Sequence, residues 1–231
     1  MVRKKTPKKA EAKLLQEKAT FLRIVARALK IASEEGLAAL TIGRLAKELK
    51  MSKSGVFAHF LSKETLELAT IERAREVFVS HVLSSAELSQ AGITKVWSLC
   101  DHWLKHIEQE IFPGSYFFNG AFFESAGQSG PIPDRIREVI QEWLDGLKRA
   151  VKQAQKEGDL DRDVDAERVA LALNGLLLGG HWAHLLGDYE ALKETRAALM
   201  DKLHALATDR IPPKAFKSVR TFRDYLEESR P

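Results

Sequence analysis

The chain has 231 residues, of which 45% are hydrophobic and 29% are charged, and its formal net charge is +4. This composition is typical of a globular protein with enough apolar residues for a core, and the absence of any run of 18 apolar residues excludes a membrane-spanning helix. The N-terminal sequence MVRKKTPKK continues into charged residues rather than an apolar signal segment. We therefore expect a cytoplasmic protein with no membrane partner.

The charges are distributed unevenly along the chain. Residues 1–60 contain 14 Lys or Arg and 5 Asp or Glu, a net charge of +9, whereas residues 61–231 contain 22 and 27, a net charge of −5. The basic part predicts contact with a polyanion such as DNA, because Lys and Arg beside phosphates release counterions. The alternative is a solvated surface with a disordered tail. The single cysteine, Cys100, excludes an internal disulfide and cannot by itself form a thiolate metal site.

The first predicted elements are a basic arm and a helix. Residues 1–13 are rich in lysine and nearly free of large apolar groups, so we expect a flexible arm that either contacts DNA or only aids solubility. From Leu14 to Glu35, apolar residues recur at three- and four-residue steps, which predicts a helix. Gly36 follows as a typical C-terminal stop.

The stretch Thr41–Phe60, TIGRLAKELKMSKSGVFAHF, predicts two short helices separated by a tight turn. The hydroxyl of Thr41 is placed to cap the first helix, and that of Ser52 is placed to cap the second. Val56 and Phe60, four residues apart, share one face of the second helix. Such a pair is a helix-turn-helix, a motif that places its second helix in the major groove of DNA.

The rest of the chain predicts further helices and no strands. We expect long helices over residues 62–88, 95–110, 131–158, 165–186 and 189–206, and short ones over 119–126 and 219–226. The predicted fold is all-α, with an N-terminal three-helix DNA-binding domain followed by a larger helical ligand-binding and dimerisation domain. The predicted limits are 1–13 for the arm, 14–66 for the DNA-binding domain, 67–210 for the larger domain and 211–231 for a C-terminal tail.

Aromatic residues are abundant in the second part of the chain, which suits either a packed core or a mostly apolar pocket. A pocket of this kind takes an apolar or amphipathic small molecule, oriented by a few polar groups. The candidate ligand-binding residues are Trp97, Cys100, Trp103, Leu104, Phe117, Phe118, Phe122, Phe123, Trp143, Asn174 and His181.

Two histidine pairs have the spacing of metal ligands on one helix face. His102 and His106 are four residues apart, and His181 and His184 are three apart. With no second thiol and no obvious carboxylate partner, surface or core histidines are the better interpretation. We predict no metal site and no cofactor.

The stretch Asn174–Trp182, NGLLLGGHW, combines leucines with Gly179 and Gly180 inside a predicted helix. Glycine destabilises a helix, so the close approach of another helix would offer a reason for both. We therefore expect a homodimer formed through the last two long helices.

The N-terminal part resembles the TetR family of bacterial transcriptional regulators. The resemblance covers Phe21 to Leu68: a helix ending at Gly36, then LTIGRLAKEL, then MSKSGVFAHFLSKETL. It implies a homodimer with its recognition helix in the major groove, and a small molecule bound in the larger domain that changes the spacing of the two DNA-binding parts. The residues that it implies to contact DNA are Thr41, Ser52, Lys53, Ser54, Gly55, Phe57, His59 and Lys63.

These residues have different implied roles. Thr41, His59 and Lys63 correspond to phosphate-contacting positions, Ser52–Ser54 open the recognition helix, and Gly55 permits close approach to the DNA backbone. Phe57 stands where tyrosine is frequent in the family, so it retains only an apolar contact, such as one with a thymine methyl; packing in the core is the alternative. Ala58 stands where a second aromatic is frequent, which removes another contact.

Together these features predict a sequence-specific transcriptional regulator and not an enzyme, because no phosphate-binding loop, HExxH motif or nucleophile with an evident base is present. We expect a ligand-responsive repressor that binds a palindromic operator as a homodimer, although activation stays open. The alternative is a helical protein–protein adaptor with only non-specific affinity for DNA.

Overall fold

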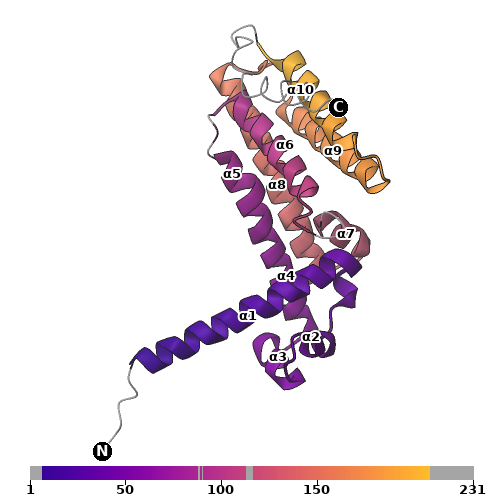
Figure 1. Cartoon of the computed structure of the whole chain (residues 1–231). Helices are drawn as coiled ribbons and strands as arrows, with labels where there is room; N and C mark the ends of the chain where they lie inside the picture. The colour runs from indigo at the N-terminus through magenta and orange to yellow at the C-terminus, as the bar shows by residue number, and fades with distance from the viewer. Residues whose placement is uncertain (1–6, 88, 90, 113–116, 209–231) are drawn as a thin grey trace, which may run out of the picture. The chain divides into compact units, whose positions relative to one another are not determined.

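The computed structural model describes residues 7–87, 89, 91–112 and 117–208, and within these ranges the fold is built from helices (Figure 1). The predicted all-α class is confirmed. The expected tail, 211–231, with its short helix, lies outside the described residues. Among the helices that are described, none combines the length and apolar character needed to cross a membrane.

Packing divides the chain into two compact units. The first comprises residues 1–77 and 112–139, and the second comprises residues 78–111 and 140–231. This grouping places residues 112–139 with the N-terminal helices, whereas the prediction assigned them to the larger domain. The functional limits 14–66 and 67–210 stay predictions.

The first unit contains the N-terminal helices and two later segments. Its elements are α1 (Pro7–Glu35), η1 (Leu37–Ala39), α2 (Ile42–Glu48), α3 (Lys53–Phe60), α4 (Lys63–Phe78) up to Val77, α7 (Phe117–Glu124) and the start of α8 (Pro131–Glu157). Gly36 ends α1 with a φ of 88°, and its N–H donates to the carbonyl oxygen of Ala32 at 3.0 Å, so the predicted stop is confirmed.

One expectation about this unit is wrong. Residues 7–13 were expected to belong to a flexible arm, but they form the first turns of α1, which begins at Pro7 rather than at Leu14. Proline suits the first turn of a helix because its missing N–H has no partner there in any case. Three lysines and two alanines are among the six residues that follow it, and both residue types are good helix formers.

The second unit is a helical bundle. It contains η2 (Val79–Leu83), α5 (Ser84–Glu87), α6 (Ile93–Glu108), the later part of α8, α9 (Ala166–Leu185) and α10 (Ala191–Leu206). Together α4, η2 and α5 correspond to the helix predicted over 62–88, with one π-helical turn, η2, inside it. Asp165 caps α9 by accepting the N–H of Glu167 at 2.8 Å.

Helices α9 and α10 lie side by side and antiparallel (Figure 1). Gly180 makes their close approach possible, because a Cβ at this position would collide with the side chain of Thr195. Arg196 then links α10 to α6: its guanidinium is 5% exposed and donates to Asp101 at 2.9 Å and to Glu108 at 2.7 Å. This pairing of charges far apart in the sequence holds the bundle together.

Candidate functional site

The helix-turn-helix is built around two capped helices, as predicted. The N–H of Arg44 donates to the hydroxyl of Thr41 at 3.1 Å, and the N–H of Gly55 donates to the hydroxyl of Ser52 at 3.0 Å. Each hydroxyl satisfies one of the backbone donors that a helix start leaves without an intrahelical partner.

The turn between the two helices is a tight helix C-cap. The N–H of Met51 donates to the carbonyl oxygen of Ala46 at 2.9 Å, and that of Lys50 donates to Lys47 at 3.3 Å. These two bonds form a Schellman motif, in which Lys50 takes the left-handed conformation with a φ of 53°. The turn therefore fixes the direction in which α3 leaves α2.

Helix α3 has a buried side and an exposed side. Val56 and Phe60 are buried, and the Phe60 ring stacks on Phe21 of α1 with their centroids 5.3 Å apart. Phe57 is 48% exposed, so the alternative that it packs in the core is wrong. Ser52, Lys53 and Ser54 are also exposed, at the N-terminal end of the helix.

The cations of this region fall into two groups. Arg44 donates to Glu48 at 3.0 Å and to Glu35 at 2.8 Å, and Arg27 also pairs with Glu48, so both arginines tie α1 to α2. The hydrogen bond from Arg44, followed by that from Arg27, holds the pKa of Glu48 below its usual range. In the part of the chain that the structure describes, Lys53 has no ion-pair partner. Its ammonium is therefore available to a phosphate.

Two predicted phosphate contacts already have partners in the first unit. Lys63 pairs with Glu67 at 3.3 Å and donates to the carbonyl oxygen of Ala38 at 3.3 Å. His59 is half-buried, with its ring centroid 6.5 Å from that of Phe21. A phosphate at Lys63 has to compete with these partners, and both roles stay predictions.

One residue of this unit was missed by sequence reasoning. The carboxylate of Glu124, the last residue of α7, accepts the N–H of Leu37 at 2.8 Å and that of Ala38 at 2.7 Å. It thus fixes the start of η1, the turn that joins α1 to α2. No periodicity or motif pairs positions 86 and 87 residues apart, so the sequence carried no signal for this contact.

The candidate ligand-binding residues are divided between the two units. Phe117, Phe118, Phe122 and Phe123 are on α7 in the first unit, where Phe117 and Phe118 are buried and the other two are exposed. The other seven, in the second unit, are Trp97, Cys100, Trp103, Leu104, Trp143, Asn174 and His181.

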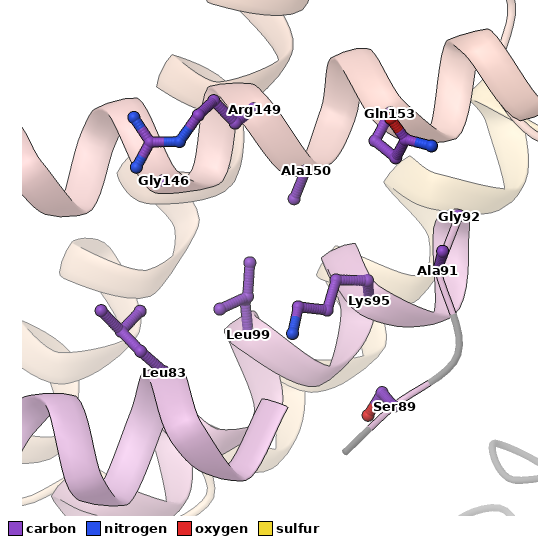
Figure 2. A pocket seen from close by; sticks show the side chains of 10 residues that line it. All are labelled: Leu83, Ser89, Ala91, Gly92, Lys95, Leu99, Gly146, Arg149, Ala150 and Gln153. Atoms are coloured by element: carbon purple, nitrogen blue, oxygen red, sulfur yellow. The ribbon is translucent and has the colours of Figure 1, made fainter. Parts of the chain in front are cut away.

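Several of these seven residues contact one another in the bundle. The indole N–H of Trp143 donates to Oδ1 of Asn174 at 2.9 Å, and the rings of Trp103 and His181 meet edge to face at 6.0 Å. Burial raises the pKa of the Cys100 thiol to about 12 and lowers the pKa of His181 to about 4. A cavity in this unit is lined by other residues, shown in Figure 2. The ligand-binding roles of the seven stay predictions.

The described residues contain no cluster of side chains that could bind a metal ion. No three His, Cys, Asp or Glu side chains among the residues that the structure describes are arranged to hold a metal ion. His102 instead has its Nδ1 2.8 Å from the carbonyl oxygen of Ser98.

Comparisons with known proteins agree with this arrangement. Residues 24–70 match the family model of the bacterial regulatory proteins of the tetR family, and residues 92–199 match that of the tetracyclin repressor-like C-terminal domain. No curated protein matches the sequence.

Solved structures share the fold over most of the chain. A TetR transcriptional regulator from Chloroflexus aurantiacus J-10-FL has a TM-score of 0.76 and 23% identity, covering 83% of this chain and 98% of its own. A regulator from Saccharomonospora viridis, solved with choline, has a TM-score of 0.69 and 21% identity over 83% and 99%. AibR, solved with isovaleryl coenzyme A and operator DNA, has a TM-score of 0.56 and 22% identity over 68% and 83%.

Proposed function

Because the chain belongs to the TetR family of bacterial transcriptional regulators, we propose that it is a ligand-responsive repressor that binds a palindromic operator as a homodimer. The observation that carries the DNA-binding part of this proposal is the exposed face of α3. A cation without an ion-pair partner among the described residues, two hydroxyls and an aromatic ring lie there on a rigidly capped helix.

Each group on this face has a counterpart on DNA. The N-terminal end of α3 presents backbone N–H groups and the positive end of the helix dipole, both of which favour a phosphate. Lys53 adds a positive charge, and Ser54 adds a hydroxyl for phosphates or base edges. Phe57 offers an apolar surface that fits a thymine methyl. Gly55 lets the DNA backbone approach closely, and Thr41 reaches a phosphate from the start of α2.

The outer face of α9 supports a homodimer. Leu171, Trp182 and Leu185 are each more than half exposed and recur at helical spacing. Gly175 and Gly179 lie between them, and an added Cβ at either would meet nothing within 4 Å. Contact within the chain thus explains Gly180 but not Gly179. Because an apolar helix face with small residues invites close packing, we assign this face to a second copy of the chain.

The ligand acts by shifting the populations of two arrangements of the recognition helices. Two recognition helices bind DNA together only when they reach successive major grooves, which lie roughly 34–36 Å apart. A ligand that prefers another arrangement lowers the operator-competent population, provided that its affinity differs between the two states. Relatives solved with choline or with isovaleryl coenzyme A support a small-molecule effector without identifying it.

A genome-wide footprint with the purified protein tests the DNA-binding proposal. We expect protected sites that share a palindromic sequence, and sedimentation at micromolar concentration should give a dimer. An adaptor with a purely structural helix-turn-helix would instead bind promoter and random fragments alike and lose both at moderate salt. A monomer in sedimentation would contradict the assignment of the α9 face.

A further inference from the structure

A cavity of about 580 Å³ lies within the second unit (Figure 2). One wall carries Leu83 from η2 with Lys95 and Leu99 from α6; the other is α8, and Ser89, Ala91 and Gly92 lie at one end. The volume is in the range of small-molecule sites. The residues that line it are Leu83, Ser89, Ala91, Gly92, Lys95, Leu99, Gly146, Arg149, Ala150 and Gln153.

The lining combines an apolar surface with two positive charges. Leu83, Leu99 and Ala150 provide hydrocarbon, while Lys95 and Arg149 provide an ammonium and a guanidinium from opposite walls. No Asp or Glu is among the lining residues. The cavity is therefore amphipathic, and the charged side chains that line it are positive.

Both cations lack an ion-pair partner within the part of the chain that the structure describes. Elsewhere in this unit, Lys105 pairs with Asp101 at 2.8 Å and Arg196 with Asp101 at 2.9 Å. Lys95 is half-buried and Arg149 is exposed. An anionic ligand would give both cations a partner of opposite charge.

Two acidic side chains near Gly92 are engaged with other groups. Asp159 accepts the backbone N–H of Ile93 at 2.9 Å, and Glu157 accepts the side-chain amide of Gln153 at 2.7 Å. Their oxygens lie near Gly92, and neither residue lines the cavity. They do not neutralise Lys95 or Arg149.

The guanidinium of Arg149 lies close to Gly146. A Cβ built on Gly146 would lie 3.7 Å from Nη2 of Arg149, so this side chain extends back over the glycine on its own helix. Arginine presents several N–H donors in a planar fork that matches a carboxylate or a phosphate.

We propose that this cavity binds an amphipathic organic anion, whose carboxylate or phosphate lies between Lys95 and Arg149 and whose hydrocarbon part packs on Leu83, Leu99 and Ala150. The proposal rests on the ligand response proposed above and gives the effector a chemical class. The residues that line this cavity are different from the ligand-binding candidates predicted from the sequence. It also excludes a quaternary ammonium as the ligand of this cavity.

Four probes with the same octyl chain test the class: octanoate, octyl phosphate, 1-octanol and octyltrimethylammonium. Each is titrated by calorimetry into the full-length protein below its micelle concentration, without DNA. We expect at least one anion to bind about tenfold more tightly than 1-octanol, and the ammonium to bind more weakly than 1-octanol. The two anions distinguish a carboxylate site from a phosphate site.

Three variants test the residues. Lys95→Met and Arg149→Met each remove a charge while keeping apolar length, and each should weaken anion binding about tenfold, with 1-octanol unaffected. Lys152→Met is the matched control, because Lys152 is exposed on the same helix and does not line the cavity. Circular dichroism and thermal unfolding confirm that each variant is folded.

Either of two results would overturn the proposal: no anion binding up to about 1 mM, or unchanged anion affinity in a folded double variant that combines Lys95→Met and Arg149→Met. Operator binding by the ligand-free protein is measured in parallel. A protein that binds its operator but shows no preference for the anions contradicts only the ligand class. One that binds the anion but no specific DNA contradicts only the proposed function.

Discussion

The proposed DNA-facing surface and the proposed ligand cavity are built in different ways. The first consists of one short stretch, Ser52–Phe57, held by a capping hydroxyl and a Schellman turn within a few residues of it. The second is formed by η2, α6 and α8, whose lining residues are up to 70 positions apart. Substitutions should therefore act locally in the first region, whereas the second depends on contacts that hold distant helices together.

The largest expected difference is between substitutions of two phenylalanines on α3, one buried and one exposed. Phe60 is 1% exposed and Phe57 is 48% exposed. Phe60→Ala should lower the free energy of unfolding by about 3–5 kcal/mol, because it removes a buried ring. Phe57→Ala should change it by less than about 0.5 kcal/mol and still weaken operator binding several-fold. Urea unfolding and fluorescence anisotropy measure the two effects, and equal stability losses would contradict the local character of the DNA-facing surface.

In the second unit, Arg196→Met should lower the free energy of unfolding by about 3 kcal/mol, because it leaves the half-buried carboxylate of Asp101 and the exposed carboxylate of Glu108 without their shared, buried partner. Arg168→Met is the control, since Arg168 is 87% exposed and, among the described residues, pairs only with Asp165 at 3.9 Å. It should cost less than about 0.5 kcal/mol in the same urea unfolding experiment. Similar losses in both variants would mean that the α6–α10 contact contributes little.

The hydrogen bonds of Asp101 make the stability of the second unit depend on pH. Burial raises the pKa of Asp101, but hydrogen bonds from Lys105 and Arg196 outweigh it and hold the value below the usual 3.8. Because the folded-state pKa is lowered, the stabilisation is complete above pH 3.8 and is lost as the pH falls through the lower folded value. Asp101→Asn should make the unfolding temperature of the protein depend less on pH in this acidic range. If the unfolding temperature of the variant falls with pH as steeply as that of the wild type, Asp101 is not the cause of the dependence.

A smaller effect is expected where Glu124 fixes the start of η1. Glu124→Ala removes the acceptor of two backbone N–H groups at an exposed site and should cost about 1 kcal/mol. Hydrogen exchange at the amides of Leu37 and Ala38 should become faster. Glu64→Gln is the control, because Glu64 lies in the same hollow without contacting these amides. Unchanged exchange in Glu124→Ala would show that the contact is not formed in solution.

Local patterns were enough to predict the helices and the DNA-binding motif. The caps Thr41 and Ser52, the stop at Gly36 and the buried pair Val56 and Phe60 all depend on neighbours within a few residues. These interactions are encoded by spacing, so they can be derived without knowing the tertiary structure. Residues 7–13 are helical although their lysines are typical of a flexible arm, because lysine and alanine are also good helix formers.

The cavity could not be derived in the same way. The ligand-binding role of the aromatic residues stays a prediction, whereas Lys95 and Arg149 stand out only once α6 and α8 are packed. Side chains of all sizes fill a bundle, and which of them border a void depends on how helices distant in sequence meet. The contact of Glu124 with η1 is unpredictable for the same reason.

The central claim, that α3 is the recognition helix, is tested most directly by the salt dependence of operator binding. Anisotropy titrations with the footprinted operator over a range of NaCl concentrations compare the wild type with Lys53→Ala and with Lys152→Ala, an exposed lysine of the other unit. We predict that Lys53→Ala weakens binding about tenfold and reduces the slope of log K against log salt by about 1, with Lys152→Ala unchanged. The same affinity and slope in all three proteins would contradict it.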